Sequence, residues 1–175
     1  MSILKIAKIG HPVLFKKGDK IEQFSTNELK KIIYDMSETM IDYQGIGLAA
    51  PQVHISKRII IFRNPDKNDN QRIQITPLIN PSFQPISNEH EDDWEGCLSI
   101  PGMQGFVRRF KKIKYSGFDM EGNKIENEAE GLHARVVQHE IDHLDGILYI
   151  ERLADKKAFG FEKEITEYWK NEKTE

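Results

Sequence analysis

One short motif in this sequence has residue types and spacing that fit metal chemistry. Residues 139–143 read His-Glu-Ile-Asp-His. Two imidazoles four positions apart on a helix project from the same face, so His139 and His143 could chelate one metal ion. Glu140 would lie beside that ion, where its carboxylate could take a proton from metal-bound water and return it to a leaving group. The alternative is a polar pair on a helix surface that matches a short pattern by chance.

A catalytic metal centre commonly has three protein ligands and one open position, so a third ligand is needed. After His143 the chain lacks the extended His-x-x-Gly-x-x-His pattern of one metallopeptidase class, although Glu151 follows at the end of an expected strand. Upstream, Cys97 lies in Glu-Gly-Cys-Leu-Ser-Ile-Pro-Gly, residues 95–102, where glycines and a proline bracket an extended segment. A lone cysteine is more often a small buried hydrophobe than a ligand. The incomplete two-histidine site nevertheless favours Cys97 as the third ligand.

A glycine-rich segment, residues 45–52, reads Gly-Ile-Gly-Leu-Ala-Ala-Pro-Gln. Its glycines permit the close approach of another chain, and its small apolar residues would let a ligand lie flat. The alternative is a tight connection between a helix and a strand that needs glycine for its dihedral angles. The segment does not decide between these roles on its own.

Three helices are expected to position these motifs. The first follows Ser25-Thr-Asn-Glu, which has capping-box spacing, and ends before Gly45. The second covers residues 132–144 and is ended by Gly146 as a C-terminal cap. Apolar residues lie on two faces of this helix, which predicts that it is central and buried. The third is an amphipathic helix over residues 155–170, followed by a frayed tail at 171–175.

Runs of β-branched and aromatic residues predict strands over residues 57–63, 72–80, 107–118 and 147–150. Residues 64–71 are polar and predict a surface loop. The strands follow one another and do not alternate with helices, which favours an α+β fold over a doubly wound parallel sheet. We therefore expect one domain over residues 1–175, with mainly antiparallel strands packed around a central metal-binding helix, an N-terminal helix and a C-terminal amphipathic helix.

The composition is that of an ordinary globular protein. The chain has 175 residues, 25 basic and 28 acidic side chains, and a net charge of -3. This balance gives no general electrostatic reason to bind DNA or an anionic membrane. The N-terminus lacks a signal-peptide pattern, and the apolar run at residues 59–62 is far too short to cross a bilayer. With one cysteine and no intrachain disulfide, we expect the protein to reside in the reducing cytoplasm. We also expect a monomer.

Taken together and in this order, three segments resemble the peptide deformylases. That family shares Gly-x-Gly-Leu-Ala-Ala-x-Gln, Glu-Gly-Cys-Leu-Ser and Gln-His-Glu-x-Asp-His-Leu, which stand here at residues 45–52, 95–99 and 138–144. With residues 9–14 and the C-terminal helix, the likeness covers nearly the whole chain. The resemblance implies a metal-dependent hydrolase that removes the formyl group from the N-terminal formylmethionine of nascent chains and releases formate.

The resemblance also implies three metal ligands, one acid–base residue and two donors to the oxyanion. The metal ligands are Cys97, His139 and His143, and the acid–base residue is Glu140. The donors to the oxyanion are Gln52 and the backbone N–H of Leu98. Ferrous iron is the usual ion in the family, and zinc, nickel or cobalt can occupy the same site. A soft thiolate ligand excludes magnesium and calcium as expected occupants.

Leu132 and Val136 share the helical stripe of the two histidines, so they could form the floor of an apolar pocket for the methionine side chain. Their alternative role is core packing. The resemblance adds Ile46 to this pocket. It also implies that the peptide pairs its backbone with Gly45, Ile46 and Gly47 as an added strand and continues along residues 100–102, in a mode that tolerates varied later side chains.

Two positions depart from the family pattern. Many bacterial relatives carry an arginine three residues beyond the proline of the cysteine segment, near the exit of the peptide groove, where this chain has Gln104. An electrostatic contact with the carboxyl end of the peptide is therefore not expected here. Arg135 stands where relatives can carry an aliphatic pocket residue, so we expect a methionine pocket with a different border.

Two other hypotheses fit parts of the sequence. His-Glu-x-x-His alone fits a metallopeptidase that cleaves internal peptide bonds and does not need Cys97. The basic run at residues 108–114 fits an RNA-binding accessory domain with a structural metal, in which Glu140 is dispensable, or a transient contact with the ribosome. Such a run is more commonly a solvated strand face, which we prefer here. Acidic residues 89–95 are expected to form a surface approach to the cysteine segment.

Overall fold

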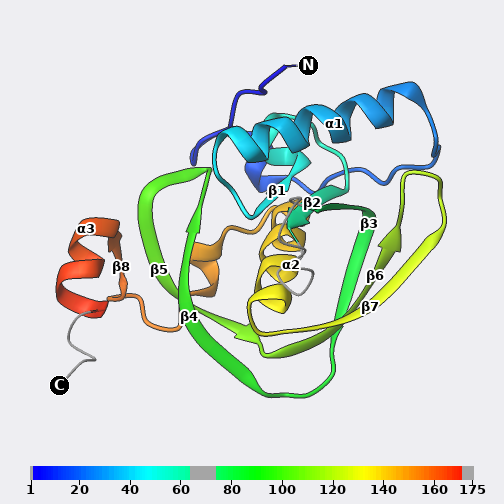
Figure 1. The fold of residues 1–175 in the computed structure, drawn as a ribbon. Coiled ribbons are helices and arrows are strands. Elements are labelled where there is room, and N and C mark those ends of the chain that lie inside the picture. Colours follow the sequence, from blue (N-terminus) through cyan, green and yellow to red (C-terminus); the bar gives the residue numbers. More distant parts are fainter. Residues whose placement is uncertain (1, 64–73, 171–175) are drawn as a thin grey trace.

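The computed structural model describes residues 2–63 and 74–170, and Figure 1 shows their arrangement. This part of the chain has three helices, α1 (Asn27–Asp42), α2 (Gly131–Leu144) and α3 (Glu162–Ile165), the last followed by a π-helical turn, Thr166–Lys170. The strands are β1 (Gly47–Ala49), β2 (Ile59–Arg63), β3 (Ile75–Pro85), β4 (His90–Cys97), β5 (Ile100–Phe110), β6 (Lys112–Phe118), β7 (Lys124–Glu130) and β8 (Phe159–Phe161). Short 3₁₀ helices are Pro12–Phe15, Ala50–Val53 and Tyr149–Arg152.

The strands form two antiparallel sheets, and α2 lies between them (Figure 1). One sheet has the strand order β1-β2-β3-β6-β7 and the other β4-β5-β8. The expected α+β fold, with mainly antiparallel strands around a central helix, is therefore confirmed.

Strand β2 lies between α1 and α2, which explains its uninterrupted apolar sequence. Successive side chains of a strand point to opposite faces. Ile59 and Ile61 pack in the cluster that contains the apolar stripe of α1, whereas Ile60 and Phe62 pack in the cluster that contains α2. Burial on both faces removes the usual alternation of apolar and polar residues.

The first two helices agree with the sequence prediction. The side chain of Thr26 accepts a hydrogen bond from the Leu29 N–H, which caps the N-terminus of α1. In α2, 11 of 14 residues are buried, as expected for a central helix. Asp145 ends α2, and Gly146 follows with φ +74°, the left-handed conformation that glycine adopts readily after a helix.

Strands β4 and β5 form a tight hairpin that carries the cysteine segment. Cys97 ends β4 and pairs with Ile100 at the start of β5, so only Leu98 and Ser99 lie in the turn. This hairpin borders α2 on the side opposite β3, β6 and β7 (Figure 1). The turn therefore brings Cys97 towards the central helix.

The strand predicted over residues 107–118 is two strands, because the chain reverses at Lys111 between β5 and β6. The strand predicted over residues 147–150 was wrong. Leu148 and Tyr149 pack in a core cluster with Val107 of β5, and the chain turns there into a 3₁₀ helix. Strand β3 is as predicted within the described residues but continues to Pro85.

The predicted C-terminal helix begins later than residue 155. Residues 159–161 instead form β8, which pairs with β5, and α3 starts at Glu162. The predicted loop at 64–71, the first two residues of the predicted strand at 72–80, and the tail at 171–175 lie outside the described residues. Among the helices that the structure describes, none has the length and apolar character needed to cross a bilayer.

Candidate metal centre

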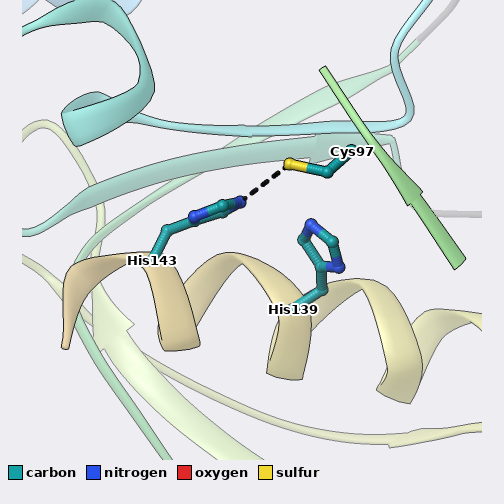
Figure 2. A group of neighbouring side chains, drawn as sticks. All are labelled: Cys97, His139 and His143. Carbon is teal, nitrogen blue, oxygen red and sulfur yellow. Dashed lines mark hydrogen bonds between the residues drawn. The ribbon is translucent and has the colours of Figure 1, made fainter. Parts of the chain in front are cut away.

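Cys97, His139 and His143 converge in the structure. Their ligand atoms all lie within 4.8 Å of one another, and Figure 2 shows the two imidazoles of α2 directed at the Cys97 sulfur. The Sγ atom of Cys97 is 3.3 Å from Nε2 of His143. In a tetrahedral site with ligand bonds of about 2.0–2.3 Å, the ligand atoms are about 3.5 Å apart. The three donors therefore fit a single ion with small shifts.

The protonation of His139 also fits a cation at this position. Burial disfavours a charged imidazole, but the hydrogen bonds with Cys97 and Glu95 raise the pKa of His139 well above its usual value. A positive charge is thus favoured beside the Cys97 sulfur, at the position where a bound metal ion would supply it in place of the proton. His143 is different, because burial and then the charge on His139 lower its pKa and favour the neutral form that a metal ligand needs.

Glu95 fixes the orientation of His139. Its Oε2 atom is 2.8 Å from Nδ1 of His139. Although burial raises the pKa of Glu95, hydrogen bonds from His139 and Arg109 hold it well below the usual value. An ionised Glu95 accepts a hydrogen bond from the Nδ1–H of His139, which leaves Nε2 of His139 available as a ligand.

Two arginines hold the same carboxylate. Arg109 donates from Nε and Nη2 to the two oxygens of Glu95, each at 3.0 Å, and Arg135 donates from Nη1 at 2.8 Å. Arg109 also pairs with Asp142 of α2. All of these side chains are buried. The cluster joins β4, β5 and α2 directly behind the metal ligands.

Two sequence predictions on this cluster were wrong. Glu95 does not belong to an acidic surface, and Arg109 does not belong to a solvated basic face. The reason is strand alternation, since Arg108 points outward to Asp92 while its neighbour Arg109 points inward. Asp142 ties α2 to a second arginine as well, because it accepts hydrogen bonds from Arg152.

From the sequence, Arg135 was expected only to change the border of the methionine pocket. Besides Glu95, its guanidinium donates to the backbone oxygens of Val107 and Glu91, at 3.0 and 2.7 Å. Helical spacing could have revealed this role of Arg135 from the sequence, because positions 135, 139 and 142 lie on one stripe of α2. Three polar side chains on one stripe of a buried helix indicate a shared partner.

Glu140 is the second buried glutamate of the site. Its Oε2 atom has no hydrogen-bond partner among the residues that the structure describes. Burial raises the pKa of its carboxyl group to about 7. Gly47 of β1 allows this placement, because a Cβ there would lie 2.9 Å from Cγ of Glu140 and overlap its Oε1.

Gln52 and Leu98 lie beside the sulfur ligand. Gln52 accepts a hydrogen bond from the Ala49 N–H through Oε1, so its Nε2 points to Cys97 Sγ at 3.3 Å and to Ser99 Oγ at 3.2 Å. The carbonyl of Leu98 accepts a hydrogen bond of 2.8 Å from Nζ of Lys8. The turn after Cys97 is thus held by two polar side chains.

One cavity of about 690 Å³ joins these residues. All of the predicted site residues line this cavity except His143. The predicted residues that line it are Gly45, Ile46, Gly47, Gln52, Cys97, Leu98, Leu132, Val136, His139 and Glu140. Ile46 and Leu132 are 49% and 54% exposed, whereas Val136 is 5% exposed. Val136 therefore lies deep in the cavity and the other two at its rim. Within the described sheet, β1 is an edge strand that pairs with β2.

An α+β fold whose partly buried cysteine and two histidines surround a position near a buried glutamate is typical of a metal-dependent hydrolase. Residues 3–159 match the family model described as polypeptide deformylase. Peptide deformylase 1 of Bordetella pertussis is 49% identical over 159 residues, which are 89% of this chain and 90% of that protein. The chain belongs to the polypeptide deformylase family.

Solved structures agree with this assignment. The peptide deformylase of Thermotoga maritima has a TM-score of 0.82 and 39% identity, and the match covers 89% of this chain and all of that one. A class I type b peptide deformylase from Acinetobacter baumannii with Met-Ala-Ser bound has a TM-score of 0.79 and 36% identity, covering 87% and 99%. The metallopeptidase alternative, which has no need of Cys97, is not supported.

We expect Glu95→Gln to lower the free energy of unfolding by about 3–5 kcal/mol, because two buried arginines keep their charges and lose the carboxylate. Metal affinity should fall about 10- to 100-fold, because the neutral amide oxygen of glutamine is a weaker orienting acceptor for His139 than the ionised carboxylate. Denaturant unfolding and metal titration measure the two effects. The matched control is Asp92→Asn, which breaks an ion pair with the exposed Arg108 and should cost about 1 kcal/mol or less.

The effect of Glu95→Gln should depend on pH. Because folding lowers the pKa of Glu95, its stabilising effect is present above the unfolded value of about 4.3 and is lost as the pH falls through the folded value. The difference in unfolding free energy between the wild type and Glu95→Gln should be largest near neutral pH and shrink below about pH 4. A difference that stays constant or grows on acidification would contradict the ionised carboxylate.

Proposed function

We propose that this protein removes the formyl group from the N-terminal formylmethionine of newly made polypeptides and releases formate. The observation that carries the proposal is the buried carboxylate of Glu140, whose Oε2 has no hydrogen-bond partner among residues 2–63 and 74–170 and which lines the same cavity as Cys97 and His139. Membership of the polypeptide deformylase family agrees with this reaction.

Cys97 Sγ and one nitrogen each of His139 and His143 would hold one divalent metal ion. When bound, the ion would polarise the formyl oxygen and lower the pKa of the attacking water towards about 7. A thiolate with two imidazoles suits iron, zinc, nickel or cobalt better than magnesium or calcium. We propose ferrous iron as the ion in the cell. A thiolate beside such an ion is open to oxidation, which fits a reducing cytoplasm.

Glu140 moves the proton in this proposal. It takes a proton from the attacking water as the new bond to the formyl carbon forms, and delivers it to the amine as the C–N bond breaks. A pKa of about 7, raised by burial, suits a group that must both accept and release a proton near neutral pH. Nε2 of Gln52 and the N–H of Leu98 would donate hydrogen bonds to the formyl oxygen as negative charge develops on it.

The cavity offers distinct places for the side chain and the backbone of the substrate. Val136 at depth, with Ile46 and Leu132 at the rim, would hold the methionine side chain. The outer edge of β1 would pair with the peptide backbone at Gly45 to Gly47. Backbone pairing accepts many sequences, which an enzyme acting on varied nascent chains requires.

We further propose that residues 1–175 act as one deformylase-like domain, as a monomer in the cytoplasm, without DNA or a membrane as a partner. Residues 108–114 would be the surface for a transient contact with the ribosome. Lys112 and Lys114 lie 3.6 and 3.9 Å from Glu128 and Glu126 of β7, which reduces the free positive charge on this face.

The first test uses protein purified without oxygen and measures formate release from formyl-Met-Ala. We expect Glu140→Gln to keep its metal and lose at least about 100-fold in rate, because the proton carrier is removed. Cys97→Ser should lose both metal and activity. An unformylated protein substrate controls for peptidase activity. Absence of formate release from wild-type protein with one metal per chain would refute the function, whereas full activity of Glu140→Gln would refute only the role of Glu140.

The second test concerns Gly47. We expect Gly47→Ala to retain metal and stability but to lose at least about 100-fold in formate release, because its new methyl group displaces the Glu140 carboxylate. Gly160→Ala is the matched control, since its Cβ would meet only the Ile165 side chain, at an ordinary 3.7 Å. Equal activity in the two alanine variants would contradict the placement of Glu140.

A further inference from the structure

Three consecutive residues near the N-terminus, 7–9, bind both parts of the chain that carry the proposed donors to the formyl oxygen. The N–H of Ala7 donates to the carbonyl of Gln52 at 2.7 Å, and the N–H of Ile9 donates to the carbonyl of Ser99 at 2.8 Å. Ala7 is also buried, in the core cluster that contains Ile100 of β5. These contacts fix the N-terminal residues against the 3₁₀ helix at 50–53 and against the turn of the β4–β5 hairpin.

Lys8 lies between these two backbone contacts, and its side chain extends to the residue that supplies the second donor. Nζ of Lys8 donates to the carbonyl of Leu98 at 2.8 Å and lies 5.9 Å from the centre of the Tyr43 ring. Lys8, Tyr43 and Leu98 all line the cavity of the metal centre. Because Lys8 is exposed, its ammonium binds the turn without the cost of burying a charge.

The conformation of this turn depends on contacts from outside the hairpin. Two-residue hairpin turns are normally of type I′ or II′, in which the first central residue has a positive φ and the turn matches the twist of its strands. Neither Leu98 nor Ser99 is among the described residues that have a positive φ. The turn thus lacks the conformation that suits a hairpin best, and residues 8 and 9 bind both of its carbonyls.

We propose that Lys8 is a positioning residue for the oxyanion donors, which holds the Leu98 carbonyl and thereby sets the direction of the Leu98 N–H. The proposal rests on the proposed function, because the donor role of Leu98 is part of that function. A donor must lie about 2.7–3.1 Å from the place that the oxyanion will occupy, so a small rotation of Leu98 weakens the hydrogen bond in the transition state. Ala7 fixes the backbone of Gln52 in the same way, so residues 7–9 together set the spacing of the two donors.

The first test is Lys8→Met, which removes the ammonium and keeps most of the length of the side chain. We expect kcat for formyl-Met-Ala to fall about 10-fold, less than the about 100- to 1,000-fold that follows loss of an oxyanion donor, because the N–H is displaced and not removed. KM should change by less than about twofold, since the donor acts in the transition state. Lys8→Arg keeps a charged donor and should retain kcat within about threefold.

Lys5→Met is the matched control. It makes the same charge change at an exposed lysine three residues away that does not line the cavity, and it should leave both kcat and KM unchanged. A second readout does not depend on turnover. In isotopically labelled, zinc-loaded protein, the residual dipolar coupling of the Leu98 N–H reports its direction, and it should change in Lys8→Met but not in Lys5→Met.

Four results would each refute the positioning role of Lys8. They are a wild-type kcat in Lys8→Met, a raised KM with unchanged kcat in that variant, an equal loss of activity in Lys8→Arg or Lys5→Met, and an unchanged coupling of the Leu98 N–H in Lys8→Met. Absence of formate release from wild-type protein would instead refute the proposed function, and the coupling would then still test whether Lys8 orients Leu98.

Discussion

The site depends on one buried carboxylate, that of Glu95. Burying an ion costs several kcal/mol, so the arrangement is stable only while Arg109, Arg135 and His139 all remain bound to it. Those partners come from β5 and α2, and Glu95 itself comes from β4. Glu95 binds His139, and Cys97, two residues further along β4, contacts His143, so the strand that carries the clamping carboxylate also brings the sulfur to α2. Geometry at the metal ligands therefore follows from an ion cluster behind them.

The two sheets make different contributions to the site. The five-stranded sheet packs against one apolar face of α2, and its edge strand β1 brings Gly47 against Glu140. The three-stranded sheet supplies Cys97 and holds the C-terminal segment. The cavity opens where the sheets meet over the helix, so a peptide in it would contact an edge strand on one side and the β4–β5 hairpin on the other.

The sequence predicted the parts of the site that are local along the chain. His139 and His143 lie one helical turn apart, and the caps of α1 and α2 are within a few residues of the helices that they end, so spacing alone located them. β4 was missed because its acidic residues suggested solvent, yet Asp92 is paired with Arg108 across the hairpin. The partner of Arg135 is 40 residues away, and no local pattern specifies such a pairing.

Two buried glutamates in one site have opposite roles because their surroundings differ. Despite the burial of Glu95, hydrogen bonds from His139 and Arg109 lower its pKa, and Arg135 donates to the same carboxylate, so Glu95 can orient an imidazole but cannot carry a proton near neutral pH. Glu140 receives no hydrogen bond from the described residues to its Oε2, and burial raises its pKa to about 7. Environments that separate the pKa values of two like groups assign the acid–base role to one of them. Arg135, which stands where relatives can carry an aliphatic pocket residue, thus helps to keep Glu95 ionised. This strengthens the difference between the two glutamates on which the proposed role of Glu140 rests.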